Sequence, residues 1–447
     1  MSVILPFPGI RYNLAQAGPL SDLIAPPYDI IGPDLQKTLH HRSPYNVIRL
    51  ILGQAQPGDD AKTNQYSRAA DLWQKWRASG ILAKDPQPAL YRYQTSFAIK
   101  TPAGLTEKTR PGFVALLKLH EYSEGKVLPH ERTLAGPKED RFQLLLRARA
   151  HFSQVLMLYP DPSGQVDQAL GEAPPRGTDP WSSEDDAGVT HSMWPITDPA
   201  TIQAVAQHLA ARPLYIADGH HRYETALAYR RYLRERSPLF AQGIDYIMAY
   251  FTPVEHPGLV IFPYHRLVHN LPQRRLSGLF KKLEASFQIE RALLSPLSQG
   301  QNRRDFIQSL IERGQDRTVF GMVDGTAGHG YFLSRKPPDP EKRHLHSELE
   351  NVLSRLDVVT LEDLALIDTL AIKPKDLLNE KYIAYVTDYD RALDAVSQPP
   401  NQLAFLMNPT PVRDVIRVAD LHGIMPEKST YFFPKLATGM VMNAMEE

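Results

Sequence analysis

The amino-acid sequence predicts an α/β (or α+β) fold whose core is a mixed β-sheet. Patterns typical of buried strands and of amphipathic helices alternate along the chain, but irregularly, which does not favour an all-parallel sheet. The sequence has no internal repeat, and its 38 prolines are spread along it, which indicates many short elements and loops. A chain of 447 residues can bury one large core or two to three ordinary ones.

In the N-terminal half, a helix is predicted from the one-sided spacing of Ala69, Leu72, Trp73 and Trp76, and two further helices are expected after Arg141 and over residues 201–211. Strands are predicted over residues 47–50, 89–98, 109–119, 151–159, 189–196 and 214–217. The second and third of these flank a Thr-Pro-Ala-Gly turn. Residues 161–186 are rich in Pro, Gly, Asp and Ser and are expected to form a loop.

In the C-terminal half, the pattern of apolar and polar residues changes after about residue 272. Strands over residues 245–251 and 259–262 are expected to pair, a hairpin is predicted over 318–333, and a strand (403–407) and a helix (411–421) follow. The sequence therefore predicts a core domain of residues 1–271 plus 399–447, and an inserted or appended C-terminal α/β subdomain of residues 272–398.

Composition excludes several classes of protein. Lys+Arg 50 balances Asp+Glu 50, so no overall positive field attracts nucleic acid or an anionic membrane. No apolar stretch is long enough to span a bilayer, and residues 1–8 lack the pattern of a signal peptide. With Cys 0 there is no disulfide, thiolate metal site or cysteine nucleophile. A cytoplasmic protein is expected, and a homodimer is possible.

The segment from Leu214 to Ala226 is the most informative part of the chain. A short apolar strand (214–217) runs into Asp218-Gly219 and then into an amphipathic helix. Asp218 suits the N-cap of that helix, and Gly219 permits a close backbone approach.

Three adjacent cationic donors, His220, His221 and Arg222, lie in the first turn of this helix, where backbone amides make no intrahelical bond. This combination favours an anion, above all a phosphate group. The alternative is an ordinary surface turn with solvated side chains. A shared metal ion is disfavoured, because neighbouring helical residues point about 100° apart.

A second constellation is Pro129-His130-Glu131-Arg132-Thr133. A zinc-protease helix needs a second histidine at position 134, which is leucine. Glu131 could instead act as a general base or hold a cation, unless the segment is an ion-paired surface loop. Lys138 and Arg141, at the following loop-to-helix junction, could contact phosphates or be solvated charges at a helix start.

A third constellation is Glu427-Lys428-Ser429-Thr430 in the tail, followed by Pro434-Lys435-Leu436-Ala437-Thr438-Gly439. Clustered hydroxyls and lysines suit phosphate contact, although the glycine pattern of a Walker loop is absent. The dinucleotide fingerprint and the nucleophile elbow of hydrolases are absent from the sequence as well.

Six segments in order resemble a bacterial and archaeal family long filed as a domain of unknown function. They are residues 25–29 (APPYD), 46–50 (NVIRL), 129–133 (PHERT), 216–226 (IADGHHRYETA), 264–267 (YHRL) and 428–435 (KSTYFFPK). The Asp218–Arg222 segment is also similar to one in archaeal free serine kinases of the ParB/sulfiredoxin-like superfamily. Sulfiredoxin chemistry itself is excluded, because it needs a thiol.

The second resemblance implies a ParB/sulfiredoxin-like element and a site for nucleotide phosphates. It places Asp218 near the reacting phosphate or its metal, with Gly219, His220, His221 and Arg222 as phosphate contacts. Glu131 is the preferred counterpart of the relatives' catalytic glutamate, and Asp29 the second choice. His130 and Thr133 are expected to contact the substrate together with Asp29.

These observations predict a small-molecule kinase. Such an enzyme would transfer a phosphoryl group from ATP or ADP, with Mg²⁺, to free L-serine or a similar hydroxylated metabolite, giving O-phosphoserine. The alternatives are a nucleotide-binding regulatory protein and a metabolite-binding or scaffold protein, both without catalysis.

Overall fold

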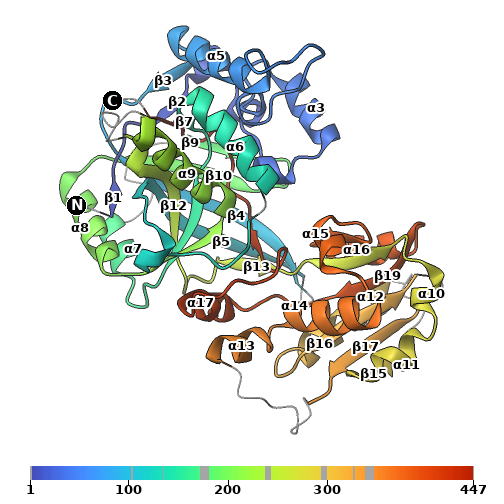
Figure 1. Ribbon diagram of the computed structural model, residues 1–447. Helices are drawn as coiled ribbons and strands as arrows, with labels where there is room; N and C mark the ends of the chain where they lie inside the picture. Colours follow the sequence, from blue (N-terminus) through green and yellow to red (C-terminus); the bar gives the residue numbers. More distant parts are fainter. Residues whose placement is uncertain are drawn as a thin grey trace.

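The computed structural model of this chain describes residues 3–101, 104–133, 135–171, 181–236, 243–292, 300–325, 328–337 and 347–445. It has two units, each built on its own β-sheet, and the end of the chain returns from the second unit to the first (Figure 1). The mixed α/β architecture predicted from the sequence is confirmed.

The first unit contains a mixed sheet in the order β6-β11-β8-β12-β5-β4-β10-β9, with β1 paired to β5. Its strands are β1 (Ile4–Leu5), β4 (Leu90–Thr101), β5 (Gly104–Lys118), β6 (Val127–Leu128), β8 (Val155–Tyr159), β9 (Trp181–Glu184), β10 (Thr190–Ile196), β11 (Leu214–Asp218) and β12 (Tyr246–Pro253). Two of the pairs are parallel, β11 with the edge strand β6 and β12 with β8, whereas β4 and β5 form the predicted long hairpin.

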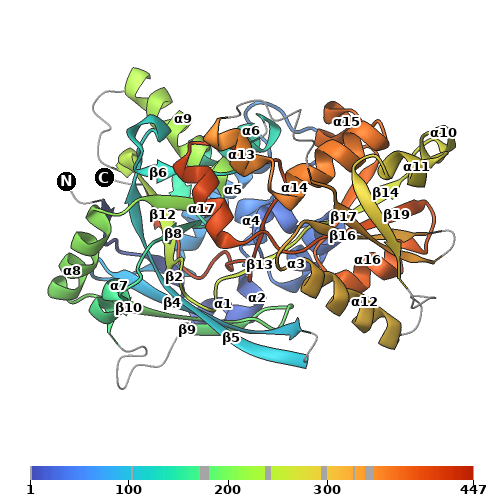
Figure 2. The ribbon, with the colours of Figure 1, turned by 90° about the horizontal axis from the view of Figure 1, so that it is seen from below.

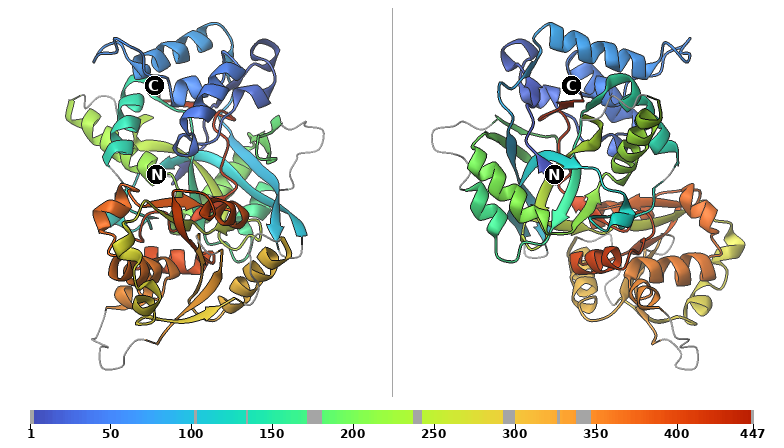
Figure 3. Two further views of the ribbon diagram at one scale, coloured as in Figure 1. Left: turned by 90° about the vertical axis from the view of Figure 1, so that its right-hand side faces the viewer. Right: turned by 60° about the vertical axis from the view of Figure 1, so that its left-hand side comes forward.

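Both faces of this sheet are covered. Along β8, Val155 and Met157 belong to one apolar cluster and Leu156 and Leu158 to another, as alternation in a strand requires. The first cluster includes residues of α7 (Gln165–Leu170), α8 (Pro199–Ala210) and α9 (His220–Arg236), and α6 (Ala135–Ala148) packs beside α9. The second includes α5 (Gln65–Ala78), the blue helix at the top of both views in Figure 3. Ala69, Trp73 and Trp76 of its predicted face are buried, and Leu72 is partly buried.

Shorter elements of the N-terminal region complete this unit. They are β2 (Ile10–Tyr12), α1 (Leu14–Ala17), α2 (Leu20–Leu23), a 3₁₀ turn (Tyr28–Ile30), α3 (Pro33–Arg42), α4 (Ile48–Ile51), β3 (Leu82–Lys84), a second 3₁₀ turn (Tyr122–Glu124), β7 (Ala150–His151) and a third 3₁₀ turn (Gly243–Asp245).

The second unit contains an antiparallel sheet in the order β15-β17-β16-β19-β14-β18. Its strands are β14 (His265–His269), β15 (Phe287–Arg291), β16 (Val319–Asp324), β17 (Gly330–Arg335), β18 (Ile383–Val386) and β19 (Asn401–Leu406). Residues of α12 (Gly300–Arg313) and α16 (Tyr389–Val396) join one apolar face. The other face meets α10 (Gln273–Leu276), α11 (Leu279–Leu283), α13 (Glu348–Leu353), α14 (Asp357–Thr360), a π-helix (Leu361–Thr369) and α15 (Pro374–Leu378).

The tail of the chain joins the two units. After β19 come α17 (Val412–Asp420), β20 (Tyr431–Phe433) and β21 (Asn443–Ala444). β20 pairs with β13 (Val260–Phe262), and β21 pairs with β7. Viewed from below, the dark-red tail runs from α17 back between the strands of the first unit (Figure 2). This path brings residues 424–435 beside the sheet end that carries Asp218.

Two sequence-based predictions are wrong. Residues 48–50 lie in a helix (α4) and not in a strand, because the Asn46 carboxamide accepts a hydrogen bond from the Ile48 amide (2.9 Å) and thereby caps a helical turn. The strand at 260–262 pairs with β20 and not with its sequence neighbour β12, which lies between β5 and β8.

The predicted loop at 161–186 is interrupted by α7 and β9, and residues 172–180 within it lie outside the described part of the chain. The predicted hairpin of β16 and β17 is present, although residues 326–327 of its turn are not described. The division of the chain at residues 272 and 398 stays a prediction. The second sheet includes β14 and β19, which lie outside those bounds, so sheet membership favours a unit that extends from β14 to β19.

Candidate functional site

The candidate site begins where β11 ends. Leu214 to Ala217 are buried, as predicted for an internal strand, and Asp218 is the last residue of the strand. Gly219 then adopts a φ of +91°, which favours glycine, and α9 begins at His220. The Tyr223 amide donates to the Gly219 carbonyl (3.0 Å), so Gly219 and not Asp218 occupies the N-cap position. This frees the Asp218 carboxylate for other contacts.

Asp218 lies between two cations. Its Oδ1 accepts a hydrogen bond from Lys435 Nζ (2.5 Å), and its Oδ2 accepts one from Arg222 Nη2 (2.9 Å). The side chains of Asp218, Lys435 and Arg222 are only 17%, 10% and 11% exposed. Burial by itself raises the pKa of Asp218, but Lys435 and Arg222 outweigh it and hold that pKa below its ordinary value. The Asp218 carboxylate is therefore ionised and pre-paired.

Glu131 lies within electrostatic reach of this cluster. Its backbone bridges to that of Met425, and its carboxylate lies close to the backbone of Lys428. Burial, and secondarily the negative charge of Asp218, raise the pKa of Glu131 to about 7, against the opposing effect of Lys435 and Lys428. A carboxylate with such a pKa can exchange a proton near neutral pH, as a general base does.

Two of the predicted ligand-binding histidines, His130 and His220, contact each other within the fold. His130 is fully buried: its Nδ1 donates to the Ile216 carbonyl (2.8 Å), and its Nε2 accepts from the Thr430 hydroxyl (3.2 Å). His220 Nε2 accepts from the His130 amide (3.3 Å), and the two rings are 4.7 Å apart. Burial lowers the pKa of both, so neither carries a charge toward a phosphate or substrate. A cationic role for His130 and His220 is therefore wrong, whereas their predicted contacts with substrate and phosphate stay predictions.

The hydroxyls of the tail loop form hydrogen bonds within the protein. The Ser429 side chain is buried and its hydroxyl donates to the Pro426 carbonyl (2.6 Å), while Thr430 is bound to His130. Both hydroxyls therefore donate within the fold, and their predicted phosphate contacts stay predictions. Lys428 is half-buried, and its backbone has a φ of +57°, a left-handed conformation that is uncommon for residues other than glycine. Such conformations cluster at functional sites, where surrounding contacts hold them.

Further predicted residues lie around the cluster. Lys138 Nζ and the Thr133 hydroxyl both donate to Glu224 Oε2, at 3.0 and 2.7 Å. The Arg141 guanidinium lies over the Tyr28 ring (4.0 Å) and pairs with Asp140.

His221 and Asp29 are also close. The side chain of His221 is half-buried. Burial lowers the pKa of His221, and the nearby carboxylates of Glu224 and Asp29 only partly oppose this. Asp29 is exposed and lies within electrostatic reach of His221 and Lys435.

Sequence reasoning placed Lys435 in the third constellation but did not single it out as a site residue, and it missed two tyrosines. Lys435 Nζ lies 4.5 Å from the centre of the Tyr431 ring, and Lys428 Nζ lies 5.6 Å from that of Tyr264. The two rings meet edge to face at 5.6 Å. Both lysines were part of a tail segment that the sequence marked as lysine-rich. Only the folded chain shows that Lys435 reaches an aspartate 217 positions away.

The donor set does not favour a metal ion at Asp218. Both of its carboxylate oxygens are bound by cations, and no group of three His, Asp or Glu side chains suited to a metal occurs among the described residues. A cation there would have to displace Lys435 or Arg222.

Two cavities flank the cluster. One of about 60 Å³ is lined by Arg141 and Arg222, and one of about 250 Å³ is lined by Arg132 and Lys428. Asp218 and Glu131 line neither of them. None of the described helices combines the length and apolarity that crossing a bilayer would need.

Residues 4–359 match a family described as "Protein of unknown function (DUF1015)". The chain belongs to this family. No curated protein matches the DUF1015 chain in sequence.

Solved structures resemble this DUF1015 member only distantly. A mutant free serine kinase in complex with ADP is 11% identical, with 69% of this chain and 84% of that chain covered and a TM-score of 0.35. A conserved hypothetical protein from Pyrococcus furiosus is 11% identical (70% and 92% covered, TM-score 0.33). SbnI with a C-terminal truncation, from Staphylococcus aureus, is 8% identical (73% and 85% covered, TM-score 0.34).

Gly219→Ala is expected to destabilise the protein more than Gly164→Ala. Both glycines precede a helix at positive φ, so an added Cβ costs about 1–2 kcal/mol at either position. At Gly219 the Cβ would also lie 2.9–3.0 Å from the Arg222 guanidinium, whereas at Gly164 it meets nothing within 4 Å. Displacing Arg222 from Asp218 adds about 1–3 kcal/mol. Urea unfolding of the two variants measures the difference; equal losses would contradict the packing of Arg222 over the turn.

Proposed function

We propose that this DUF1015 protein is a phosphotransferase that moves a phosphoryl group from ATP or ADP to the hydroxyl of free L-serine or a similar small metabolite. The observation that carries the proposal is the buried Lys435–Asp218–Arg222 cluster with Glu131 beside it, at the start of α9. Phosphoryl transfer needs positive charge around the phosphate oxygens and a group that accepts the hydroxyl proton. The cluster offers both. The similarity of the Asp218–Arg222 segment to free serine kinases supports the choice of reaction.

In the proposed reaction, the acceptor hydroxyl gives its proton to the Glu131 carboxylate as its oxygen attacks the terminal phosphorus. The bond between that phosphorus and its bridging oxygen breaks, and the shortened nucleotide leaves with the electron pair. Lys435 and Arg222 stabilise the negative charge that builds up on the phosphoryl oxygens. Asp218 holds both cations in place, which makes it a positioning residue in this scheme.

The amides of the α9 first turn and the half-buried His221 extend the positive side of the site. Lys138 and Arg141 lie nearby but are already paired with Glu224 and Asp140. We assign them to the entry of the site and not to the transferred phosphate. Asp29, exposed and near His221, is placed to meet the amino group of an incoming amino acid.

Mg²⁺ accompanies the nucleotide in most phosphoryl transfers and neutralises its phosphates. Because Asp218 is paired on both oxygens, no ligand in this chain is assigned to it, and no step above depends on such a contact.

Incubating the purified protein with L-serine, Mg²⁺ and either ATP or ADP tests the proposal. O-phosphoserine, detected by mass spectrometry, is expected with at least one donor and not without serine. Binding of nucleotide with no phosphorylated product from a pool of hydroxylated metabolites would favour the regulatory alternative. Absence of both binding and product would favour a scaffold in which the cluster is only structural.

A further inference from the structure

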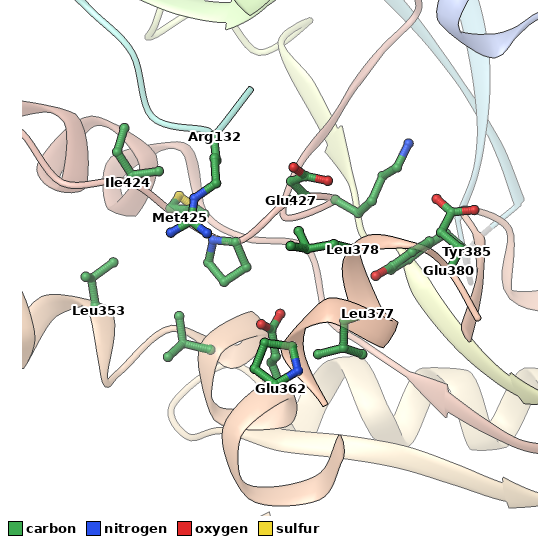
Figure 4. Close-up of a pocket in the computed structure, with 14 residues that line it drawn as sticks. Arg132, Leu353, Glu362, Leu377, Leu378, Glu380, Tyr385, Ile424, Met425 and Glu427 are labelled. Atoms are coloured by element: carbon green, nitrogen blue, oxygen red, sulfur yellow. The ribbon is translucent and has the colours of Figure 1, made fainter. Parts of the chain in front are cut away.

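A cavity of about 250 Å³ lies between the two units, outside the Asp218 cluster. Its upper wall in Figure 4 is formed by Arg132 and by the tail loop from Ile424 to Lys428. Its lower wall belongs to the helical part of the second unit, with Leu353, Glu362 and Leu377. The second unit therefore supplies half of a binding space that the first unit does not enclose by itself.

The lining combines an apolar surface with unpaired charges. Among the described residues, the side chains of Arg132, Glu362, Glu380 and Glu427 form no hydrogen bond within 3.5 Å and no ion pair within 4.0 Å. Oε1 of Glu427 is inaccessible to solvent and without a partner. Buried polar groups in native structures nearly always have a partner, so an isolated carboxylate oxygen at a cavity wall points to an absent ligand or an ordered water.

The charges are arranged on both sides of the space. Glu427 and Glu362 lie on opposite walls in Figure 4, and Glu427 is near enough to affect Arg132 and Glu380 electrostatically. Burial raises the pKa of Glu362, and Arg266 and Arg132 only partly oppose this. The lining carries three carboxylates and two cations (Arg132 and Lys428), so it favours a ligand with a positive group.

We infer that this cavity binds a small zwitterion of the amino-acid class with an apolar side chain. The ligand's ammonium group would pair with Glu362 and Glu427, and its carboxylate with Arg132. Its side chain would lie against Leu353, Leu377 and Met425. A polyphosphate is disfavoured, because three carboxylates would repel it.

Size supports this ligand class. Sites for drug-sized molecules have volumes of about 300–1,000 Å³, and an apolar cavity of about 150 Å³ holds benzene. A space of 250 Å³ lies between these limits and suits a single amino acid. The inference does not depend on the proposed kinase activity. Because Glu131 does not line the cavity, this ligand is separate from the proposed phosphoryl acceptor.

Calorimetric titration of the full chain, without nucleotide, tests the inference with three matched probes. L-norleucine carries both charges, pentylamine lacks the carboxylate, and hexanoate lacks the amine. L-norleucine is expected to bind, pentylamine more weakly, and hexanoate weakest of all. No measurable heat with L-norleucine at millimolar concentration, or equal affinity for hexanoate, would overturn the inference.

Three variants test whether L-norleucine binds in this cavity. Glu362→Gln is expected to lower the affinity for L-norleucine about ten-fold or more, since one charge-assisted contact is lost. Arg132→Met should weaken L-norleucine but leave pentylamine unchanged. Leu378 lines the cavity and is 42% exposed. Leu378→Trp should therefore block the binding of L-norleucine and of pentylamine without disturbing the fold.

Glu284→Gln, at an exposed residue remote from the cavity, is the control and should bind L-norleucine as the parent does. Circular dichroism confirms that each variant is folded. Unchanged affinity in a folded Glu362→Gln and a folded Leu378→Trp protein would place the binding elsewhere and refute the assignment.

Discussion

Lys435→Met is expected to lower the free energy of unfolding by about 3–5 kcal/mol, because it leaves the Asp218 carboxylate with one of its two cations in a site only 17% exposed. Asp218→Asn should cost a similar amount by leaving Lys435 and Arg222 to repel each other. The double variant should cost clearly less than the sum of the two losses. Removing both charges leaves neither an unpaired anion nor two cations that repel each other. Urea unfolding followed by circular dichroism gives the three values.

Lys428→Met is the matched control for this double-mutant cycle. Lys428 lies in the same tail segment and also sits near a tyrosine ring, but it forms no ion pair within 4 Å among the described residues. Its replacement should change stability by no more than about 1 kcal/mol. Strictly additive losses at Asp218 and Lys435 would show that the contact between them contributes nothing, and the proposed phosphate site would lose its geometric basis.

The second large effect is expected for Glu131→Gln. If Glu131 accepts the proton of the acceptor hydroxyl, the variant should lose about 10²–10⁴-fold in turnover, the usual contribution of a general base. Glutamine has nearly the size and shape of glutamate, so the fold should survive. Phosphoserine formation measures the loss, with Glu284→Gln as a control of equal chemistry at an exposed position.

The pH dependence of the activity is a second test of Glu131 as the general base. A general base acts in its ionised form, so kcat/KM of the parent should rise through pH 7, where Glu131 titrates. The Glu131→Gln variant should lack this limb. Stability should change in the opposite direction. Because the folded-state pKa of Glu131 is raised, its neutral form stabilises the fold fully below about pH 4.5, and this contribution is lost as the pH rises through about 7.

Above pH 7 the glutamine variant should therefore be at least as stable as the parent. Lower stability of the variant at pH 8, or a parent profile that stays flat between pH 6 and 8, would remove Glu131 from the role of base.

Local sequence patterns predicted many of the elements correctly. The spacing of apolar residues in α5, the alternation of β4 and β5, and the strand-turn-helix of β11 and α9 follow from side-chain periodicity, which acts over a few residues. Residues 47–50 are the exception. Their β-branched composition favours a strand, but the Asn46 cap, tied to the carbonyls of Asp22 and Ile24, fixes a helical turn.

The candidate site could be predicted only in part, for a physical reason. The cationic turn and Glu131 were found because each lies in a short polar segment with its own pattern. The sequence does not show which of these side chains are buried, so it could not distinguish His220 from the half-buried His221. Burial, together with the neighbouring His130, lowers the pKa of His220.

By itself, the sequence determined what depends on neighbouring residues: the class of fold, most helices and strands, and the concentration of charge at Asp218–Arg222. Tertiary structure alone decided which distant groups meet. Packing of the tail against the first sheet places Lys435 on Asp218 and Lys428 on Glu131, and docking of the second unit closes the cavity at Arg132. Long-range pairings depend on burial and on the path of the whole chain, so no local pattern encodes them.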